Sequence, residues 1–399
     1  GSGAQPGSES SAASPGRADA LPPERALDPF QGELLDLAYR AASAMPLNPH
    51  VKNRSRAQEA VVAACLDLDQ PRRALRYIEG IQDWRRGAAY ADLAFHCARR
   101  GEPNGVQGYL DLAGQIAEEN AKDENAQEWR RDRIRTKIAK THVWLGEARR
   151  AEAFEADVVD SEQGKVDAVR AMRLEAADFD RQVEALEGVV ANGSLDRVQN
   201  ALATYTRLLD RFYDDAEKRA RIEEKVAAAH RRLPALARLE SRMELAEVAL
   251  GHGDRAKALE QVEEAKRTME GTRWLPEHEL PVRGRLAGLR HRAGDAEGAR
   301  REAAAALATF DANRERIVDI YRAGALRPLA EAYEAMGDAG SARKVYGMAI
   351  EEGVANPNSR PRAEDLSATC CSMATNRVDP GSDLRARMLQ ICEGLGPPW

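Results

Sequence analysis

The segment LAEAYEAMGDAGSARKVYGMAIE, residues 329–351, decides the fold. Leu329 and Tyr333 are four residues apart, so they share one face of a helix, and small and bulky residues alternate at helical spacing in the second half. Between the halves, Gly337 can end a helix in the left-handed region and Asp338 can cap the next helix. The segment therefore predicts two antiparallel helices joined by a tight turn.

The spacing of small residues in this segment indicates how the two helices pack. Ala330, Ala342 and Ala349 allow the helices to approach closely, while Tyr333 and Tyr346 are large enough to fill the space beside them. One such hairpin cannot bury its own apolar face, so neighbouring hairpins must stack on it.

The same pattern recurs through most of the chain. Clear copies lie at 245–265 and 286–306, and weaker copies lie at 61–81, 93–113, 138–158 and 185–205. Their turn positions, 32 to 60 residues apart, are Asp69, Gly101, Gly146, Gly193, Gly253, Gly294 and Gly337. The longest interval predicts an additional helix near 214–232.

These residues resemble the tetratricopeptide repeat (TPR), in which a Leu, a small residue and an aromatic residue in the first helix precede small, bulky and small residues in the second. Segment 329–351 fills all seven positions. The resemblance is firm from residue 240 onward and looser between 60 and 240, because most intervals exceed the family's period of about 34 residues. The chain is similar to uncharacterised bacterial TPR proteins.

The resemblance implies an all-α fold, a TPR-like right-handed helical solenoid of about seven antiparallel helix pairs with a C-terminal capping helix pair. A first helix is expected near 30–45. Composition agrees, since 31% of the 399 residues are charged and only 5% are aromatic, which is typical of long amphipathic helices. The predicted division is a disordered Gly/Ser/Pro/Ala-rich linker at 1–29, the repeat array at 30–355 and capping helices at 356–399.

Several classes of function are not supported by the sequence. The net charge is −6 with both signs interspersed, so no basic surface is predicted for nucleic acid, and no apolar run is long enough to span a membrane. The phosphate-loop, calcium-loop and HExxH zinc patterns are absent. We therefore expect a protein without catalytic residues, metal or cofactor, and hence not an enzyme.

The location of the protein is predicted from its opening segment and its cysteines. Residues 1–29 have neither an initiator Met nor an apolar stretch, as expected for a linker left after removal of an export signal or for a tag remnant. The first interpretation is favoured and predicts a periplasmic or cell-envelope protein. The odd number of five cysteines, without a CxxC pair, favours the alternative of a reducing, cytoplasmic location.

The family resemblance implies a protein or peptide partner, bound in a concave groove that is lined by the first helix of each pair. The Asn of the family's carboxylate clamp would lie two residues after the helix Leu. Those positions here are Phe95, Lys140, Glu247, Gly288 and Glu331. The clamp is absent, so the expected function is a non-catalytic protein–protein interaction scaffold whose partner and oligomeric state are not specified.

Two arginines, Arg322 and Arg327, are the first candidate binding residues. They precede Pro328, which removes one helical hydrogen bond and would distort the helix near Gly324. Forked guanidinium groups bind carboxylates and other anions. The alternative is that both arginines are solvated or ion-paired.

The polar segment NPNSRPRAED at 356–365 provides the other candidates. Pro361 predicts the start of a capping helix at about 361–375, followed by a last helix at about 383–394. Asn358, Arg360 and Arg362 are not required by that helix. They would bind a polar ligand or a partner, or else hydrogen-bond their own backbone.

These candidates define an alternative function, a solenoid that binds or senses a small anionic ligand with Arg322, Arg327 and the 356–365 loop. A further possibility is self-assembly through the exposed ends of the repeat array.

Overall fold

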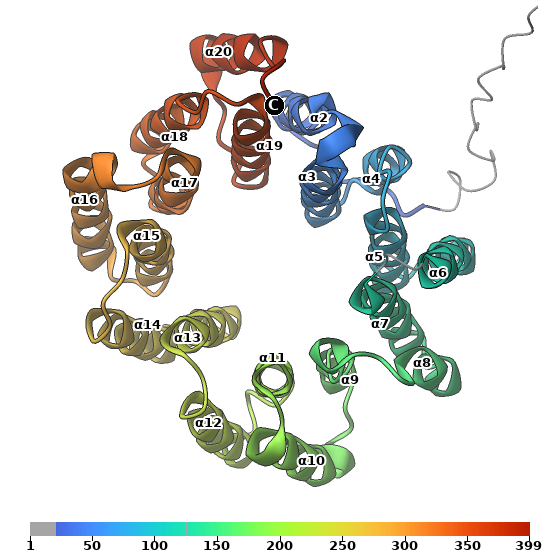
Figure 1. Ribbon diagram of the computed structural model, residues 1–399. Coiled ribbons are helices and arrows are strands. Elements are labelled where there is room, and N and C mark those ends of the chain that lie inside the picture. The colour runs from blue at the N-terminus through green and yellow to red at the C-terminus, as the bar shows by residue number, and fades with distance from the viewer. Residues whose placement is uncertain (1–20, 124–126) are drawn as a thin grey trace, which may run out of the picture.

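The computed structural model describes residues 21–123 and 127–399, and these form helices and no strands. Figure 1 shows the helices as a closed ring of two layers. The inner layer contains α3 (Leu47–Asp67), α5 (Arg85–Arg99), α7 (Glu128–Trp144), α9 (Asp167–Met172), α11 (Leu195–Arg211), α13 (Ala235–Gly251), α15 (Pro276–Arg292), α17 (Asp319–Ala335) and α19 (Ser359–Thr375). The outer layer contains α2 (Pro29–Ala44), α4 (Pro71–Ile78), α6 (Val106–Lys122), α8 (Ala148–Glu155), α10 (Phe179–Asn192), α12 (Ala216–His230), α14 (Arg255–Glu270), α16 (Ala296–Asn313), α18 (Ala339–Val354) and α20 (Gly381–Glu393). Short 3₁₀ turns are η1 (Asp160–Glu162), η2 (Ala176–Asp178) and η3 (Arg314–Arg316).

The predicted tight turns connect inner helices to the outer helices that follow them. The backbone is left-handed at six of the seven turn positions, namely Asp69, Gly101, Gly146, Gly253, Gly294 and Gly337. These six predictions are confirmed. The left-handed conformation is what allows a helix to end and reverse within a few residues.

The predicted turn at Gly193 is wrong in its direction. Gly193 has a φ of −75° and leads from outer α10 into inner α11, rather than from an inner helix to an outer one. Ser194 fixes the start of α11, because its hydroxyl oxygen accepts a hydrogen bond from the backbone amide of Arg197 and caps the helix. The helix expected near 214–232 is present as α12, but it is the outer partner of α11 and not an addition to the repeat.

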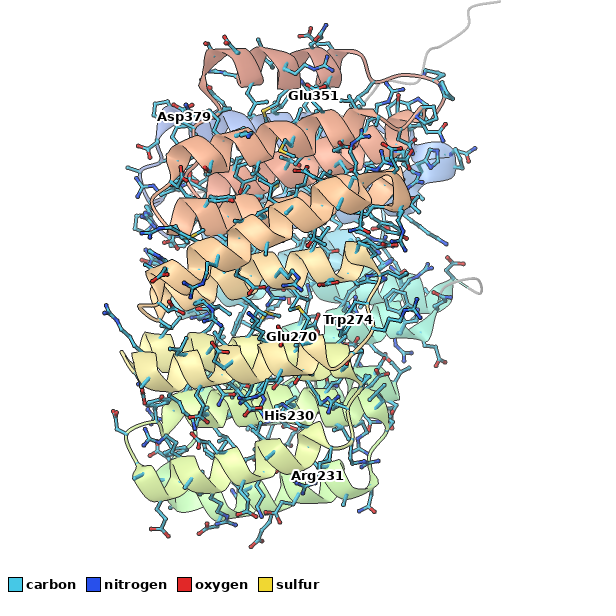
Figure 2. The ribbon with its side chains drawn as sticks, turned by 90° about the vertical axis from the view of Figure 1, so that its left-hand side faces the viewer. His230, Arg231, Glu270, Trp274, Glu351 and Asp379 are labelled. Atoms are coloured by element: carbon cyan, nitrogen blue, oxygen red, sulfur yellow. The ribbon has the colours of Figure 1, made fainter. Side chains whose placement is uncertain are left out.

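The two ends of the ring differ because all inner helices run in the same direction. We call the end where inner helices begin the loop face, and the end where they finish the turn face. Ser194 bonds Asp160 on the loop face, and His252 lies 3.0 Å from Asp210 on the turn face. In Figure 2, Trp274 of the loop face and Asp379 of the turn face lie toward opposite edges of the ring.

The ring is closed by a contact between the two ends of the helical array, which we call the seam. Helix α19 packs on α2 as extensively as α13 packs on α14, and it also contacts α3. Across the seam, the Gln31 amide donates to the carbonyl of Ala374 at 2.8 Å, and Asn53 donates to Glu364 at 2.6 Å. Helix α2 thus takes the outer position beside α19, although 314 residues separate the end of α2 from the start of α19.

The helices expected near 30–45, 361–375 and 383–394 are present as α2, α19 and α20. Helix α20 lies outside α19, between α18 and α2, and its Arg385 pairs with Glu33 of α2. Of the predicted linker, residues 1–20 lie outside the described residues. Residues 21–28 run beside the α3–α4 turn, and there the Arg25 carbonyl accepts the side-chain amide of Gln70 at 2.6 Å.

The buried apolar residues form two clusters. The first contains both ends of the array, including Leu35 of α2 and Met373 of α19, and the second extends from Ala171 to Ala293. Helix α15 contributes to both clusters, so they are continuous on that side. On the other side, the buried residues between the clusters belong to neither, and they are Ala139, Ala151, Val158, Val166 and Val169.

Candidate binding site

The predicted site residue Arg322 lies in the first turn of α17 and is largely buried. Its Nε donates to the carbonyl of Ile317 at 2.9 Å, and its Nη1 lies 3.5 Å from Glu352 of α18. Both contacts tie the start of α17 to its neighbours. The guanidinium is therefore part of a structural ion pair in this conformation.

Arg327 lies further along α17 and faces α19. Its Nη1 is 3.2 Å from Asp365, where burial raises the pKa of the carboxyl group to about 6 although Arg327 acts to lower it. Burial also raises the pKa of Glu331, which accepts a hydrogen bond from Ser372 at 2.6 Å. Helix α17 continues through Pro328 and lies against α15 so closely that a Cβ on Gly284 would be 2.7 Å from the amide nitrogen of Leu329.

The predicted loop residues surround the start of α19. Arg362 turns back on its own loop and donates to the carbonyls of Asn356 at 2.7 Å and Pro357 at 2.6 Å. The backbone amide of Asn358 donates to the side chain of Asn356 at 2.8 Å. These bonds satisfy two carbonyls of the loop and the amide of the residue that precedes α19.

Arg360 connects the loop to the seam. It pairs with Glu364 at 2.9 Å, and Glu364 in turn accepts the hydrogen bond of Asn53 from α3. The five predicted residues thus lie on α17 and around the start of α19, and they contact different partners. The four guanidinium groups among them already have carboxylate or carbonyl partners.

A second candidate site lies on the concave side of the ring, between α3 and α5, and we call it the inner pocket. It has a volume of about 580 Å³ and opens near the turn face. Its lining combines apolar, acidic and basic side chains, which are Ala63, Leu66, Asp67, Asp69, Asp92, Phe95, His96, Arg99 and Arg100. Phe95 is the residue that the repeat pattern places toward the groove.

Several polar groups of the inner pocket have no partner among the described residues. Nε2 of His96 is 3.7 Å from Asp69, which is too long for a hydrogen bond, and it has no other partner. Asp67 forms no hydrogen bond or ion pair there. Burial lowers the pKa of His96, so its imidazole loses hydration without gaining a bond, whereas Asp67 is exposed to solvent.

Arg99 stands on an aromatic platform at the edge of the inner pocket. Its guanidinium carbon lies 5.8 Å from the ring of Phe95 and 5.7 Å from that of Trp144. The two rings pack edge to face at 6.0 Å. An exposed arginine on such a platform keeps its N–H groups free while its plane is fixed by the rings.

The remaining charges near the inner pocket are paired with each other. Lys137 of α7 lies 2.5 Å from Asp92 and 3.8 Å from Glu59 of α3. Asp67, His96 and Arg99 are thus the charged or titratable side chains available to a ligand. The sequence pattern indicated Phe95 alone, because the other members come from two repeat copies whose register is loose.

No family model and no curated protein matches the chain. Among solved structures, one similar chain is a single-substitution variant of a candidate kinesin light chain from Podosopora anserina with nearly identical TPR-like repeats. The TM-score is 0.26 and the sequence identity is 20%, over 59% of this chain and 99% of the other. The fold itself is a TPR-like helical repeat, as the inner and outer helices and their left-handed turns show.

Within residues 21–123 and 127–399, no helix combines the length and the hydropathy that crossing a bilayer would require.

Proposed function

We propose that this chain is a non-catalytic protein-interaction scaffold that binds a segment of a partner protein on its concave face, at the inner pocket. The observation that supports this most directly is the buried Nε2 of His96 without a hydrogen-bond partner, beside the exposed charges of Asp67 and Arg99 and the apolar floor of Phe95. A peptide has backbone donors and acceptors as well as charged side chains, and so can satisfy all three.

The aromatic platform supports a peptide more than a small anion. Phe95 and Trp144 offer apolar area, and carboxylates at Asp67, Asp69 and Asp92 would repel a ligand that had only negative charge. The buried Nε2 of His96 costs free energy until a ligand supplies its bond. Asp67 offers acceptors and Arg99 offers donors beside it, which favours ligands that bear both kinds of group.

The test is selection of a displayed library of random peptides on the intact chain. We expect the wild type to enrich a set of related peptides, and the double variant Phe95→Ala/Arg99→Glu to lose them. The matched control is Arg301→Glu, which makes the same change of charge on outer helix α16, where the arginine is 66% exposed. Thermal unfolding verifies that all three proteins are folded.

Two results would contradict the proposal. One is that the wild type enriches no peptide family. The other is that the double variant retains the same peptides as the control.

The alternative, an anion site at Arg322, Arg327 and the 356–365 loop, stays a prediction. Its best-placed member is Arg327, where an anion would have to displace Asp365. Phosphate and citrate in a thermal-shift titration test it, because a stabilisation that is lost in Arg327→Ala but kept in Arg99→Glu would favour the alternative over the inner pocket.

A further inference from the structure

The large apolar side chains that remain exposed are concentrated at one end of the ring. Of eight such side chains in the described residues, seven lie on the loop face, at the starts of inner helices. These seven are Leu47, Leu195, Leu236, Leu275, Val318, Ile320 and Tyr321. The eighth, Leu145, lies on the turn face.

Most of the seven form a continuous series along the ring. Leu195, Leu236, Leu275 and Ile320 begin the inner helices α11, α13, α15 and α17, and each of these helices contacts the next. We call this series, together with Val318 and Tyr321, the apolar arc. Leu275 is 60% exposed and Val318 is 53% exposed, so the arc is open to solvent. Clusters of this kind on a soluble protein mark surfaces that contact another molecule.

Charges of both signs accompany the apolar arc. Leu195 is followed by Asp196 and Arg197, while Leu275 is preceded by Arg273 and followed by Glu277. The balance does not suit a nucleic acid or an anionic membrane, since both require a basic surface. A surface with both signs around an apolar centre is complementary to its own copy, because a two-fold axis can bring each charge opposite one of the other sign.

The surface around the apolar arc is also large enough for a stable protein interface. Segments 194–197, 231–236, 272–278 and 314–321 hold about 25 residues, which matches the roughly 20–30 that each partner contributes to a stable interface. These segments lie on the loop face, whereas the inner pocket opens near the turn face. Contact through the loop face would therefore leave the inner pocket accessible.

We propose that two copies of this ring associate through their loop faces, with apolar arc against apolar arc, as an isologous dimer. This goes beyond the binding of a partner segment in the inner pocket and does not depend on it. The ends of the helical array are closed on each other at the seam, so self-association through those ends is not the route.

The test measures the mass of the chain in solution by sedimentation velocity and light scattering over a range of concentrations. We expect the wild type to reach twice the chain mass of 43.8 kDa. Leu236→Glu/Leu275→Glu places two carboxylates in the centre of the interface and should weaken dimerisation by at least about 100-fold, since central apolar anchors dominate interface energies. Both leucines are exposed in the single ring, so the variant should stay folded and should match the unfolding temperature of the wild type at concentrations where the wild type is monomeric.

The matched control is Leu145→Glu, the same change at the exposed leucine of the turn face, and it should dimerise like the wild type. The proposal is overturned if the wild type is monomeric at every concentration. It is also overturned if the double variant dimerises as tightly as the control, or if a monomeric wild type binds phosphatidylserine vesicles through the arc.

Discussion

The seam and the junction between α7 and α9 join neighbouring inner helices in opposite ways. At the seam, helices from the two ends of the chain share one apolar cluster that includes Leu35 and Met373. At the α7–α9 junction, helices close in sequence contact each other less extensively, and Ile138 of α7 and Ala171 of α9 belong to different clusters. Proximity in sequence therefore does not decide where neighbouring helices of the ring pack most extensively.

Polar contacts replace the missing core at the α7–α9 junction. Asp132, fully buried in α7, accepts the amide of Val159 at 2.8 Å and pairs with Arg131. Arg173 donates to the carbonyl of Trp144 and lies 5.4 Å from its ring. Such contacts hold a geometry but contribute less free energy of unfolding than a continuous apolar core.

The largest effect is expected from Leu35→Ala in the seam. Leu35 is fully buried and lies one turn after Gln31, so both side chains face α19. Removing its side chain should lower the free energy of unfolding by about 3 kcal/mol, through lost burial and the cavity left behind. Urea unfolding followed by circular dichroism measures the change.

The control for this prediction is Leu145→Ala, which removes the same atoms from an exposed site on the turn face and should change the free energy of unfolding by less than about 0.5 kcal/mol. Equal effects from the two variants would show that the seam is not a continuous core in solution.

Asp132→Ala should have the next largest effect, at the α7–α9 junction. It leaves the Val159 amide without its acceptor in a buried environment, which costs about 2 kcal/mol. Because α7 and α9 share few contacts with each other, the loss should be local. Hydrogen exchange should accelerate at residues 156–166 while the amides of α2 and α19 keep their protection.

Asp196→Ala is the control, since Asp196 is exposed at the start of α11 and forms no part of the junction. If exchange accelerated equally at the seam in Asp132→Ala, the ring would open as one unit and the contrast between the two regions would be lost.

The sequence predicted the local structure of the seam, but it predicted neither α9 nor the contrast between the two regions. Helix starts and tight turns depend on nearby residues, so α2, α19 and six left-handed turns follow from spacing alone. The pairing of α2 with α19 depends on the curvature that every intervening hairpin adds, and a small change per repeat would leave the ring open. No local pattern in residues 30–45 records that outcome.

Prediction of the candidate sites from the sequence is limited in the same way. Arg322, Arg327, Arg360 and Arg362 were identified as cationic groups near one another, but their partners lie on other elements or in their own loop backbone. The inner pocket was missed except for Phe95, because His96 and Asp67 gain significance only when α3 and α5 lie side by side. Spacing along one helix cannot show which polar groups the neighbouring helix leaves without partners.

The smallest effect concerns pH and tests the α19 side of the seam. Burial raises the pKa of Asp365 to about 6, above the value of about 3.9 expected in the unfolded chain, so the folded protein binds this proton more tightly. The contribution to stability is complete below the unfolded pKa and is lost as the pH rises through the folded pKa. Between pH 7 and pH 5 it should add about 1.3 kcal/mol to the free energy of unfolding.

Asp365→Asn removes this proton while keeping the size of the side chain beside Arg327. Other groups titrate in both proteins, so the quantity to compare is the difference in free energy of unfolding between wild type and variant at each pH. On acidification from pH 7 to pH 5, the free energy of unfolding of the wild type should rise by about 1 kcal/mol relative to that of the variant. A difference independent of pH would mean that Asp365 is hydrated in solution, and that the α19 side of the seam is packed no more tightly than the α7–α9 junction.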